Sequence, residues 1–478
     1  MSADKTITAL RKEGRIAEAY TQGYELLESN QNDDYLKNAI GWVLYEKIKA
    51  IVSEAKRKPK STGKLSRGLR KLLREYAKLG LSRPDLLFSL LLSQSIQFPD
   101  KPTFLPKFMM WAGLDAFRPE DLIAQAGKDG KVYESLLEKT ARTIGKIARD
   151  ISAQDFPDIK EIQSFSISLI DLAISETSLK RAELLRYYKA VLLNQIGESL
   201  LAQDILIPLV RSKQNDFWTW EALADAVKPN DAERAITLYI KACLTCHDEG
   251  FSVGVLDSLG AIAAQQHKLD IAKWAAHRAF HIRQQRGWSV STTLGQLVEA
   301  PWYKEESVQP ISQGSLQQIA KDAELFIQAD LPQYNANYID NFTTKRGKQI
   351  AKFGAVINGE PQELTMPMRS VQSNLKFVAG EPVKLTVNDS TDRLNIMAVS
   401  QRQSGSSFDS MRQVSGRFRL HPKGFGFVDD AYVPHEIASQ LTDGQSACVA
   451  VVKKLDRKKN KWGLTAIAAI DEAPLQPD

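Results

Sequence analysis

The stretch "GRFRLHPKGFGFVDDAYVP", residues 416–434, decides the fold of the last part of this chain. Its alternation predicts strands, and residues two apart in a strand point to the same face, so Phe425 and Phe427 should project together. The glycines beside them leave the opposite side slim, which suits a tightly curved barrel. Two exposed rings on one face make a surface on which bases can stack. The alternative is that at least one of the two rings faces the barrel core.

Similar alternation appears in two blocks after the helical part of the chain. In the second block, residues 414–471, the pattern predicts five strands, the number in an OB-fold barrel. The first block, residues 340–400, matches it: "FGAV" (353–356) with "FGFV" (425–428), and "AGEPVKLTV" (379–387) with "DGQSACVAV" (443–451). We therefore expect two small all-β OB-fold barrels, joined by a polar linker at 401–413. Only the second has the rings, so the first is expected to be structural or to bind a partner.

The second block resembles the cold-shock-type domains at the front of the RNase II/RNase R exonuclease family. Those domains begin with Gly-Arg, reach a Gly-aromatic-Gly-Phe motif eight residues later, and continue into an Asp-x-aromatic-Val-Pro strand. Here Gly416-Arg417 leads to "GFGF" (424–427) and then to "DAYVP" (430–434). "KGFGFV" (423–428) is also similar to the first ribonucleoprotein motif of cold-shock domains. The resemblance implies an OB fold that binds single-stranded nucleic acid.

The sequence departs from the cold-shock pattern at two places. Pro434 stands where bacterial cold-shock proteins have a His between aromatics, and Phe418 stands where they have a Trp. Alternation places Phe418 opposite Arg417 and Arg419, which leaves open which set faces the ligand. The predicted nucleic-acid-binding residues are the rings and cations Arg417, Phe418, Arg419, His421, Lys423, Phe425, Phe427, Tyr432, His435, Lys453, Lys454, Lys458, Lys459 and Lys461.

The chain before residue 330 has a helical pattern that repeats. "QNDDYLKNAIG" (31–41) matches "QNDFWTWEALA" (214–224), and each follows a glycine and an alanine five residues apart: Gly14 with Ala19, and Gly197 with Ala202. This layout resembles a tetratricopeptide hairpin, in which the glycine turns the chain and the alanine lets two helices approach. We expect an all-α solenoid with a hairpin at 1–54 and a repeat domain at 79–330, with units at about 184–286. The alternative is a helical domain without repeats.

Solenoids of this kind usually bind proteins or peptides, so a protein partner is expected on the helical surface. The alternative is a scaffold whose groove has no ligand. Between the two helical parts lies a basic segment, residues 55–78, in which "KRKPKSTGKLSRGLRKLLREYAK" (56–78) has ten basic residues and one acidic residue. The segment is predicted to form a loop followed by an amphipathic helix with a basic face. This face could neutralise phosphates; the alternative is that it is only a solvated surface. The candidate residues are Lys56, Arg57, Lys58, Lys60, Lys64, Arg67, Arg70, Lys71 and Arg74.

No cofactor, metal or catalytic site is expected. "CLTCH" (243–247) has the form of a haem-attachment motif, and its cysteines could join His277 and His281 on zinc, but the spacing is far from that of zinc fingers. The exonuclease resemblance stops before a catalytic domain, and no Walker, HExxH or GxSxG motif occurs. Three cysteines, a polar N-terminus and the lack of a long apolar run favour the cytoplasm and no membrane contact.

These features predict a non-catalytic cytoplasmic adaptor. Its C-terminal barrel would bind single-stranded RNA or DNA, with RNA favoured, and its helical repeats would bind protein partners. Bacterial proteins of similar layout look like accessory parts of stress or phage-defence systems. Two alternatives are a pure protein-interaction scaffold, and a ribosome-associated translation factor that contacts RNA through both the barrel and the basic segment.

Overall fold

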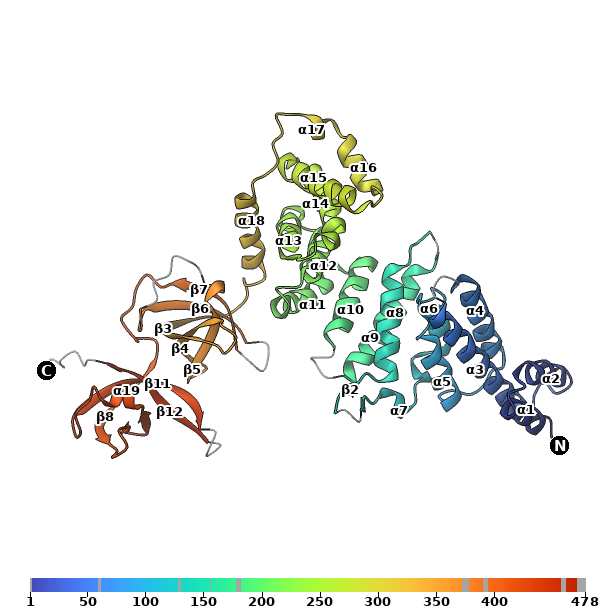
Figure 1. The fold of residues 1–478 in the computed structure, drawn as a ribbon, viewed down its shortest axis with the longest axis horizontal. Coiled ribbons are helices and arrows are strands. Elements are labelled where there is room, and N and C mark those ends of the chain that lie inside the picture. Colours follow the sequence, from blue (N-terminus) through green and yellow to red (C-terminus); the bar gives the residue numbers. More distant parts are fainter. Residues whose placement is uncertain are drawn as a thin grey trace. The chain divides into compact units, whose positions relative to one another are not determined.

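The computed structural model describes residues 2–58, 62–127, 130–154, 156–177, 182–371, 378–389, 394–456 and 461–470. The chain forms two compact units, a helical unit (Met1–Ala323) and a β unit (Glu324–Asp478). Figure 1 traces both from blue to red. The predicted order, helices first and strands afterwards, is confirmed. Lys60, Lys458 and Lys459, three of the predicted binding residues, lie outside the described residues.

The helical unit consists of antiparallel helices, most of which bury one face against their neighbours. A two-stranded ribbon of β1 (Gln125–Ala126) and β2 (Val132–Tyr133) interrupts them. The helices are α1 (Ala3–Lys12), α2 (Ile16–Ser29), α3 (Asp34–Arg57), α4 (Thr62–Lys78), α5 (Leu86–Ser95), α6 (Leu105–Ala112), α7 (Pro119–Leu122), α8 (Leu136–Asp150), α9 (Ile159–Ser175), α10 (Glu183–Ile196), α11 (Ser199–Ser212), α12 (Phe217–Val227), α13 (Ala232–Thr245), α14 (Val253–Gln265), α15 (Leu269–Arg286), α16 (Thr292–Glu299), α17 (Pro301–Lys304) and α18 (Gln313–Phe326).

Three consecutive hairpins, α10–α11, α12–α13 and α14–α15, follow one another, and each helix packs on the next. Their first helices begin at residues 183, 217 and 253, which are 34 and 36 residues apart. Gly197 has the left-handed φ of +101° that a turn glycine favours, and Ala202 is fully buried. The assignment of these hairpins to a tetratricopeptide-type solenoid stays a prediction.

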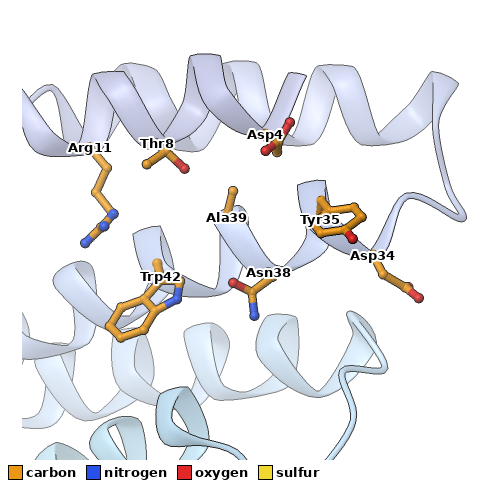
Figure 2. Close-up of a pocket in the computed structure, with 8 residues that line it drawn as sticks. All are labelled: Asp4, Thr8, Arg11, Asp34, Tyr35, Asn38, Ala39 and Trp42. Carbon is orange, nitrogen blue, oxygen red and sulfur yellow. The ribbon is translucent and has the colours of Figure 1, made fainter. Parts of the chain in front are cut away.

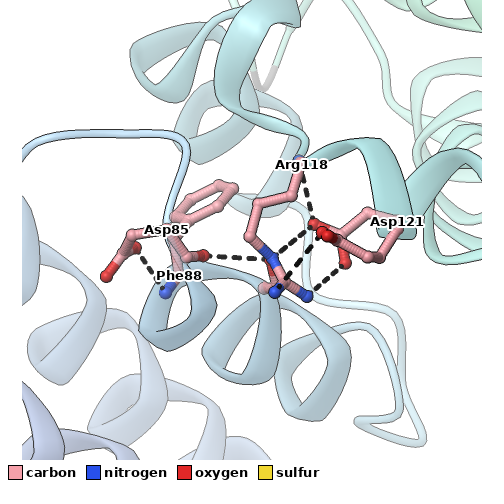
Figure 3. A network of polar contacts seen from close by, with 6 residues as sticks. Asp85, Phe88, Arg118 and Asp121 are labelled. Carbon is pink, nitrogen blue, oxygen red and sulfur yellow. Dashed lines mark hydrogen bonds and ion pairs between the residues drawn. The ribbon is translucent and has the colours of Figure 1, made fainter.

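A polar network fixes α5 against α7 (Figure 3). Asp85 caps α5 by accepting a hydrogen bond of 2.9 Å from the Phe88 N–H. Arg118 donates to Ser89 Oγ at 2.9 Å and pairs with the buried Asp121 at 3.1 Å. Since the buried carboxylate is both paired and hydrogen-bonded, its burial is compensated. The network thus joins two helices that are separated in the sequence by α6.

The β unit contains two five-stranded sheets with the same strand order. Counted within each block, the order is third, second, first, fourth, fifth. In the second block the third strand also pairs in parallel with the fifth and closes a barrel. The first sheet is β3 (Gln333–Thr343), β4 (Gln349–Ile357), β5 (Glu360–Pro367), β6 (Pro382–Asn388) and β7 (Asn395–Gln401); the barrel is β8 (Arg412–Leu420), β9 (Gly426–Val428), β10 (Ala431–Val433), β11 (Ser446–Asp456) and β12 (Lys461–Ile470), with a short helix α19 (His435–Ala438).

The prediction of two closed barrels is therefore confirmed only for the second block. In the first block no backbone pairing joins edge strands β5 and β7 within the described residues, so the sheet stays open. That sheet also begins at Gln333, before the predicted boundary of 340. Asn337 is polar but fully buried in β3, so the sequence there lacks the alternation of apolar and polar residues that predicts a strand.

The segment predicted as a linker is an ordered strap (residues 402–411). Phe408 and Met411 are buried in a cluster with Ile339 of β3 and with Ala450 and Val452 of β11. Asn337 pins the strap: its side chain accepts a 2.9 Å hydrogen bond from the Ser410 N–H and donates one of 2.9 Å to the Gly380 carbonyl. The strap thus contributes to a hydrophobic core that lies between the two sheets and is separate from the core of each. A Ser-rich segment is therefore packed here and is not a flexible linker.

The matched segments "FGAV" and "FGFV" turn opposite sets of residues toward their cores. Residues 353–356 lie in β4 and residues 426–428 form β9, the second strand of each block, with Phe425 immediately before β9. However, Phe353 and Ala355 lie in the core of the first sheet, whereas Gly426 and Val428 are the inward positions of the barrel. A shift of one residue exchanges the two faces of a strand. The first sheet therefore lacks the surface rings because its aromatic residue points inward.

Candidate nucleic-acid interface

Four aromatic rings form a cluster on the outside of the barrel, which we call the ring cluster: His421, Phe425, Phe427 and Tyr432. The His421 and Phe425 rings stack with centroids 4.2 Å apart and an angle of 11°. The Phe425 centroid lies 5.8 Å from Phe427 and 5.4 Å from Tyr432. The Tyr432 side chain is 39% exposed, and the two phenylalanines are half-buried. The predicted common face of Phe425 and Phe427 is present, and it includes Tyr432 and His421.

The inward side of β9 explains why these rings face out. Phe418 of β8 is fully buried in the barrel core. A Cβ at Gly426 would overlap the Phe418 ring and approach the Arg419 carbonyl oxygen to 2.8 Å, so only glycine fits there. The structure therefore corrects the inclusion of Phe418 among the binding residues: its ring fills the space that the glycine leaves, and it has no surface for a ligand.

A tight turn at residues 421–424 holds one end of the ring cluster. The His421 N–H donates to the Phe425 carbonyl at 2.7 Å, and the Gly424 N–H donates to the His421 carbonyl at 2.8 Å. Gly424 has a φ of +85°, a conformation that favours glycine. His435 Nδ1 donates to the Gly424 carbonyl at 2.8 Å. His435, predicted to bind nucleic acid, thus also supports the turn that places His421 on Phe425.

Exposed cations flank the ring cluster. Arg417 and Arg419 both project outward from β8, because the intervening Phe418 points inward. Arg419 lies directly across from Phe427 in the sheet register, and Lys423 is exposed in the turn. On the β11–β12 hairpin, Lys461 is exposed beside Trp462, whose side chain is 58% exposed. Trp462 was not among the predicted residues, although "DRKKNKW" places it next to a run of cations.

Lys453 and Lys454 were predicted to bind nucleic acid, but both form ion pairs with the first sheet. Lys453 Nζ lies 2.9 Å from a Glu360 oxygen, and Lys454 Nζ lies 3.0 Å from a Glu363 oxygen. Both glutamates belong to β5 of the first sheet. The two lysines therefore join the sheets by ion pairs, and their charge is already partly compensated before any phosphate approaches.

The predicted amphipathic helix in the basic segment is present as α4. Leu69, Leu72 and Leu73 are buried, whereas Lys64, Arg67, Arg70, Lys71 and Arg74 are exposed. The helix before it, α3, continues to Arg57, so part of the predicted loop is helical. Among its cations, Lys56 donates to Gln97 Oε1 at 2.7 Å and Lys58 pairs with Glu54 at 3.2 Å.

The helical unit has a groove suited to a peptide (Figure 2). It is a pocket of about 490 Å³ between α1 and α3. The Tyr35 side chain is 80% exposed at one end, and the Arg11 guanidinium lies 5.4 Å from the Trp42 ring centroid at the other. The lining combines apolar rings with acidic, basic and amide groups: Asp4, Thr8, Arg11, Asp34, Tyr35, Asn38, Ala39 and Trp42.

The cysteines and histidines considered for zinc lie on neighbouring hairpins. Cys243 is on α13 and Cys246 follows it, whereas His277 and His281 are on α15. The His277 ring lies 6.2 Å from the Tyr303 ring, and His281 Nε2 is 2.9 Å from Gln285 Nε2. Within the described residues, no group of three His, Cys, Asp or Glu side chains is arranged to hold a metal ion. The helices described there also include none long and apolar enough to cross a membrane.

Two parts of the chain are similar to known families. Residues 412–469 match a family described as S1/CSD-like domain 2 of the TOTE conflict systems, and this match covers the barrel and its ring cluster. Residues 183–323 match a family described as a domain of unknown function, DUF7017, which covers the three consecutive hairpins. No curated protein matches the chain. The predicted cold-shock-like character of the barrel is confirmed, while its likeness to the exonuclease family stays a prediction.

Proposed function

We propose that this protein is a non-catalytic cytoplasmic adaptor that binds single-stranded nucleic acid through the ring cluster of its barrel. RNA is the favoured ligand. Protein partners bind the helical unit, and the chain works within a conflict system of the kind named in the family match. The observation on which the proposal rests is the ring cluster: Phe425, Phe427 and Tyr432 lie within 6.0 Å of one another, centroid to centroid, on one outer face.

The chemistry of this face supports stacking with flanking phosphate contacts. A base that stacks on an aromatic side chain contributes about 1–3 kcal/mol, and stacking accepts any base because each has a π-face. Arg417, Arg419 and Lys423 supply positive charge beside the rings for the sugar-phosphate backbone. OB-fold and cold-shock domains recognise single-stranded RNA through such exposed rings, and the S1/CSD-like match covers these strands.

The test is a Phe425→Ala/Phe427→Ala double variant of the full chain. Its affinity for a labelled oligouridylate should fall by about 2 kcal/mol or more, roughly thirtyfold, at low salt. Phe342→Ala is the matched control, because Phe342 is 40% exposed on the first sheet, away from the ring cluster. Equal binding by both variants, or no binding by the unaltered protein, contradicts the proposal. The same titration with oligodeoxythymidylate compares RNA with DNA.

The groove of the helical unit favours a second function, binding of a protein alone. It offers two aromatic rings and both signs of charge, which suits a peptide side chain with a polar end. Capture of partners before and after nuclease treatment separates the two functions. Partners that survive nuclease but are lost in Tyr35→Ala identify the groove as a protein site, and the Phe425→Ala/Phe427→Ala variant should retain them.

A further inference from the structure

Helix α4 displays a straight row of cations, which we call the basic row: Lys64, Arg67, Lys71, Arg74 and Lys78. Their spacing alternates between three and four residues, so they fall on one face of the helix. All five side chains are exposed, and the opposite face buries Leu69, Leu72, Leu73 and Tyr76. At about 1.5 Å per residue, the basic row extends over roughly 21 Å with a charge about every 5 Å.

The charge of the basic row is largely uncompensated. Lys71 lies 3.8 Å from Glu75, but the same carboxylate accepts a 2.9 Å hydrogen bond from Tyr20. In the part of the chain that the structure describes, no acidic oxygen lies within 4.0 Å of the side-chain nitrogens of Lys64, Arg67, Arg74 or Lys78. With ten basic residues and one acidic, residues 56–78 have a net charge of +9, while the whole chain has +6. Like charges three and four apart destabilise a helix, a cost that a bound polyanion would remove.

Beside the basic row, a pocket of about 230 Å³ opens between α4 and α6. Arg70 and Arg74 line it together with Lys107, Phe104, Phe108 and Trp111 of α6 and its N-terminal boundary. Trp111 is already engaged: its ring stacks on Phe108 with centroids 5.3 Å apart, and the Arg83 guanidinium lies 3.9 Å from its centroid. Lys107 is already paired with Asp158 at 2.9 Å, so Arg70 and Arg74 are the cations that the pocket offers, beside the partly exposed ring of Trp111.

The surface chemistry distinguishes a nucleic acid from an acidic protein as the ligand. The cores of protein interfaces are built on aromatic and apolar side chains, often with arginine, and are poor in lysine. No large hydrophobic side chain of α4 is exposed in the described residues, and its outer face consists of Lys and Arg. Phosphate groups are the usual partners of such a face, because Lys and Arg bind them by charge and hydrogen bonds without apolar contacts.

We infer that the basic row, with Arg70 beside it, is a second nucleic-acid contact that binds the phosphate backbone without reading bases. It goes beyond the ring cluster and does not depend on it, since it belongs to the helical unit. When both contacts engage one strand, the second binding event becomes intramolecular and raises the overall affinity. Binding at the basic row is sequence-independent, and each neutralised phosphate changes the dependence of log K on log salt by about 0.7 for a single strand.

The test is an Arg67→Gln/Arg70→Gln/Arg74→Gln variant of the full chain, titrated at several salt concentrations. The probe is a fluorescein-labelled oligouridylate longer than the roughly 4–16 nucleotides that one OB fold covers. Removing three phosphate contacts should make the salt slope about 2 shallower and weaken binding most at low salt. Arg67→Lys/Arg70→Lys/Arg74→Lys keeps the charge at the same positions and should keep the slope.

A second control removes three exposed lysines elsewhere in the helical unit, Lys5→Gln/Lys304→Gln/Lys321→Gln, and should leave the slope unchanged. An unchanged slope in the Arg-to-Gln variant overturns the inference, even if an acidic protein partner is lost. The same variant made with Phe425→Ala/Phe427→Ala distinguishes the two sites. If the ring cluster is not a binding site but the basic row is, the Arg-to-Gln substitutions still make the salt slope shallower. If the basic row is not a binding site but the ring cluster is, the Phe425→Ala/Phe427→Ala substitutions still lower the affinity.

Discussion

Gly426 lies where β9 passes over the Phe418 ring of β8. The absence of a side chain at this one position lets a large ring fill the barrel core directly behind the strand. The two flanking phenylalanines then have no room inward, and they project from the opposite face. The ring cluster therefore depends on a residue that contacts no ligand.

Gly426→Ala should destabilise the barrel. The new methyl group would overlap the Phe418 ring and lie 2.8 Å from a backbone oxygen, and overpacking of this kind costs about 1–3 kcal/mol. Gly463→Ala is the matched control, because no atom lies within 4 Å of a Cβ there. Urea unfolding of both variants, followed by far-ultraviolet circular dichroism, measures the difference. Equal midpoints for the two variants would show that the barrel adjusts to the methyl group.

At this scale, alternation alone predicted that Phe425 and Phe427 share a face, because the side-chain period of a strand is two. It did not show that Phe418 points inward, since alternation separates two sets of residues without saying which set is buried. The pairing of Lys453 with Glu360 was equally hidden, because the partners are 93 residues apart in the sequence. Sequence patterns locate neighbours along one strand, whereas neighbours from another sheet depend on the tertiary fold.

Helix α12 contains two neighbouring acids, the half-buried Glu221 and, one turn later, the exposed Asp225. Burial, together with the Asp225 carboxylate one turn away, raises the pKa of Glu221 to about 7. Asp225 accepts a hydrogen bond from the Tyr239 hydroxyl of α13. Glu221 makes the α12–α13 hairpin, in the middle of the three consecutive hairpins, a place where folding is linked to proton binding.

The free energy of unfolding should therefore fall as the pH rises from about 4.5 to about 7. In this window the folded protein keeps the Glu221 proton, which the unfolded chain releases near the ordinary pKa of 4.5, so the folded state binds more protons. Glu221→Gln should flatten this dependence. Chemical unfolding of the two proteins at several pH values measures it. Glu299→Gln, at an exposed position on α16, is the control and should keep the full dependence.

The helices themselves were largely accessible from sequence. Gly14 and Gly197 were expected to turn the chain, and both have a left-handed φ. Asp33 caps α3 by accepting a 3.0 Å hydrogen bond from the Leu36 N–H. Local chemistry determines such boundaries, so a local pattern finds them. The start of β3 was missed because Asn337 satisfies its polar groups with the distant strap and Gly380.

At the scale of the whole β unit, the strap makes two sheets behave as one body. Phe408→Ala should separate them, because it removes a ring that is 9% exposed from the shared core. Loss of such a ring costs about 3–5 kcal/mol, and calorimetry of the full chain should show the β unit melting in two transitions in place of one. Phe342→Ala removes an exposed ring of the same size and should leave a single transition, as in the unaltered protein.

The barrel closes where Tyr432 of β10 pairs in parallel with Thr465 of β12. This contact joins distant parts of the sequence, and the chain entropy lost in bringing them together must be offset before the barrel is complete. Contacts of long sequence separation also slow folding. Tyr432 lies directly across from Phe427 in the sheet register, so the contact that closes the barrel also holds one ring of the ring cluster in place. During synthesis, the barrel can close only after β12 has left the ribosome, well after the helical unit has emerged.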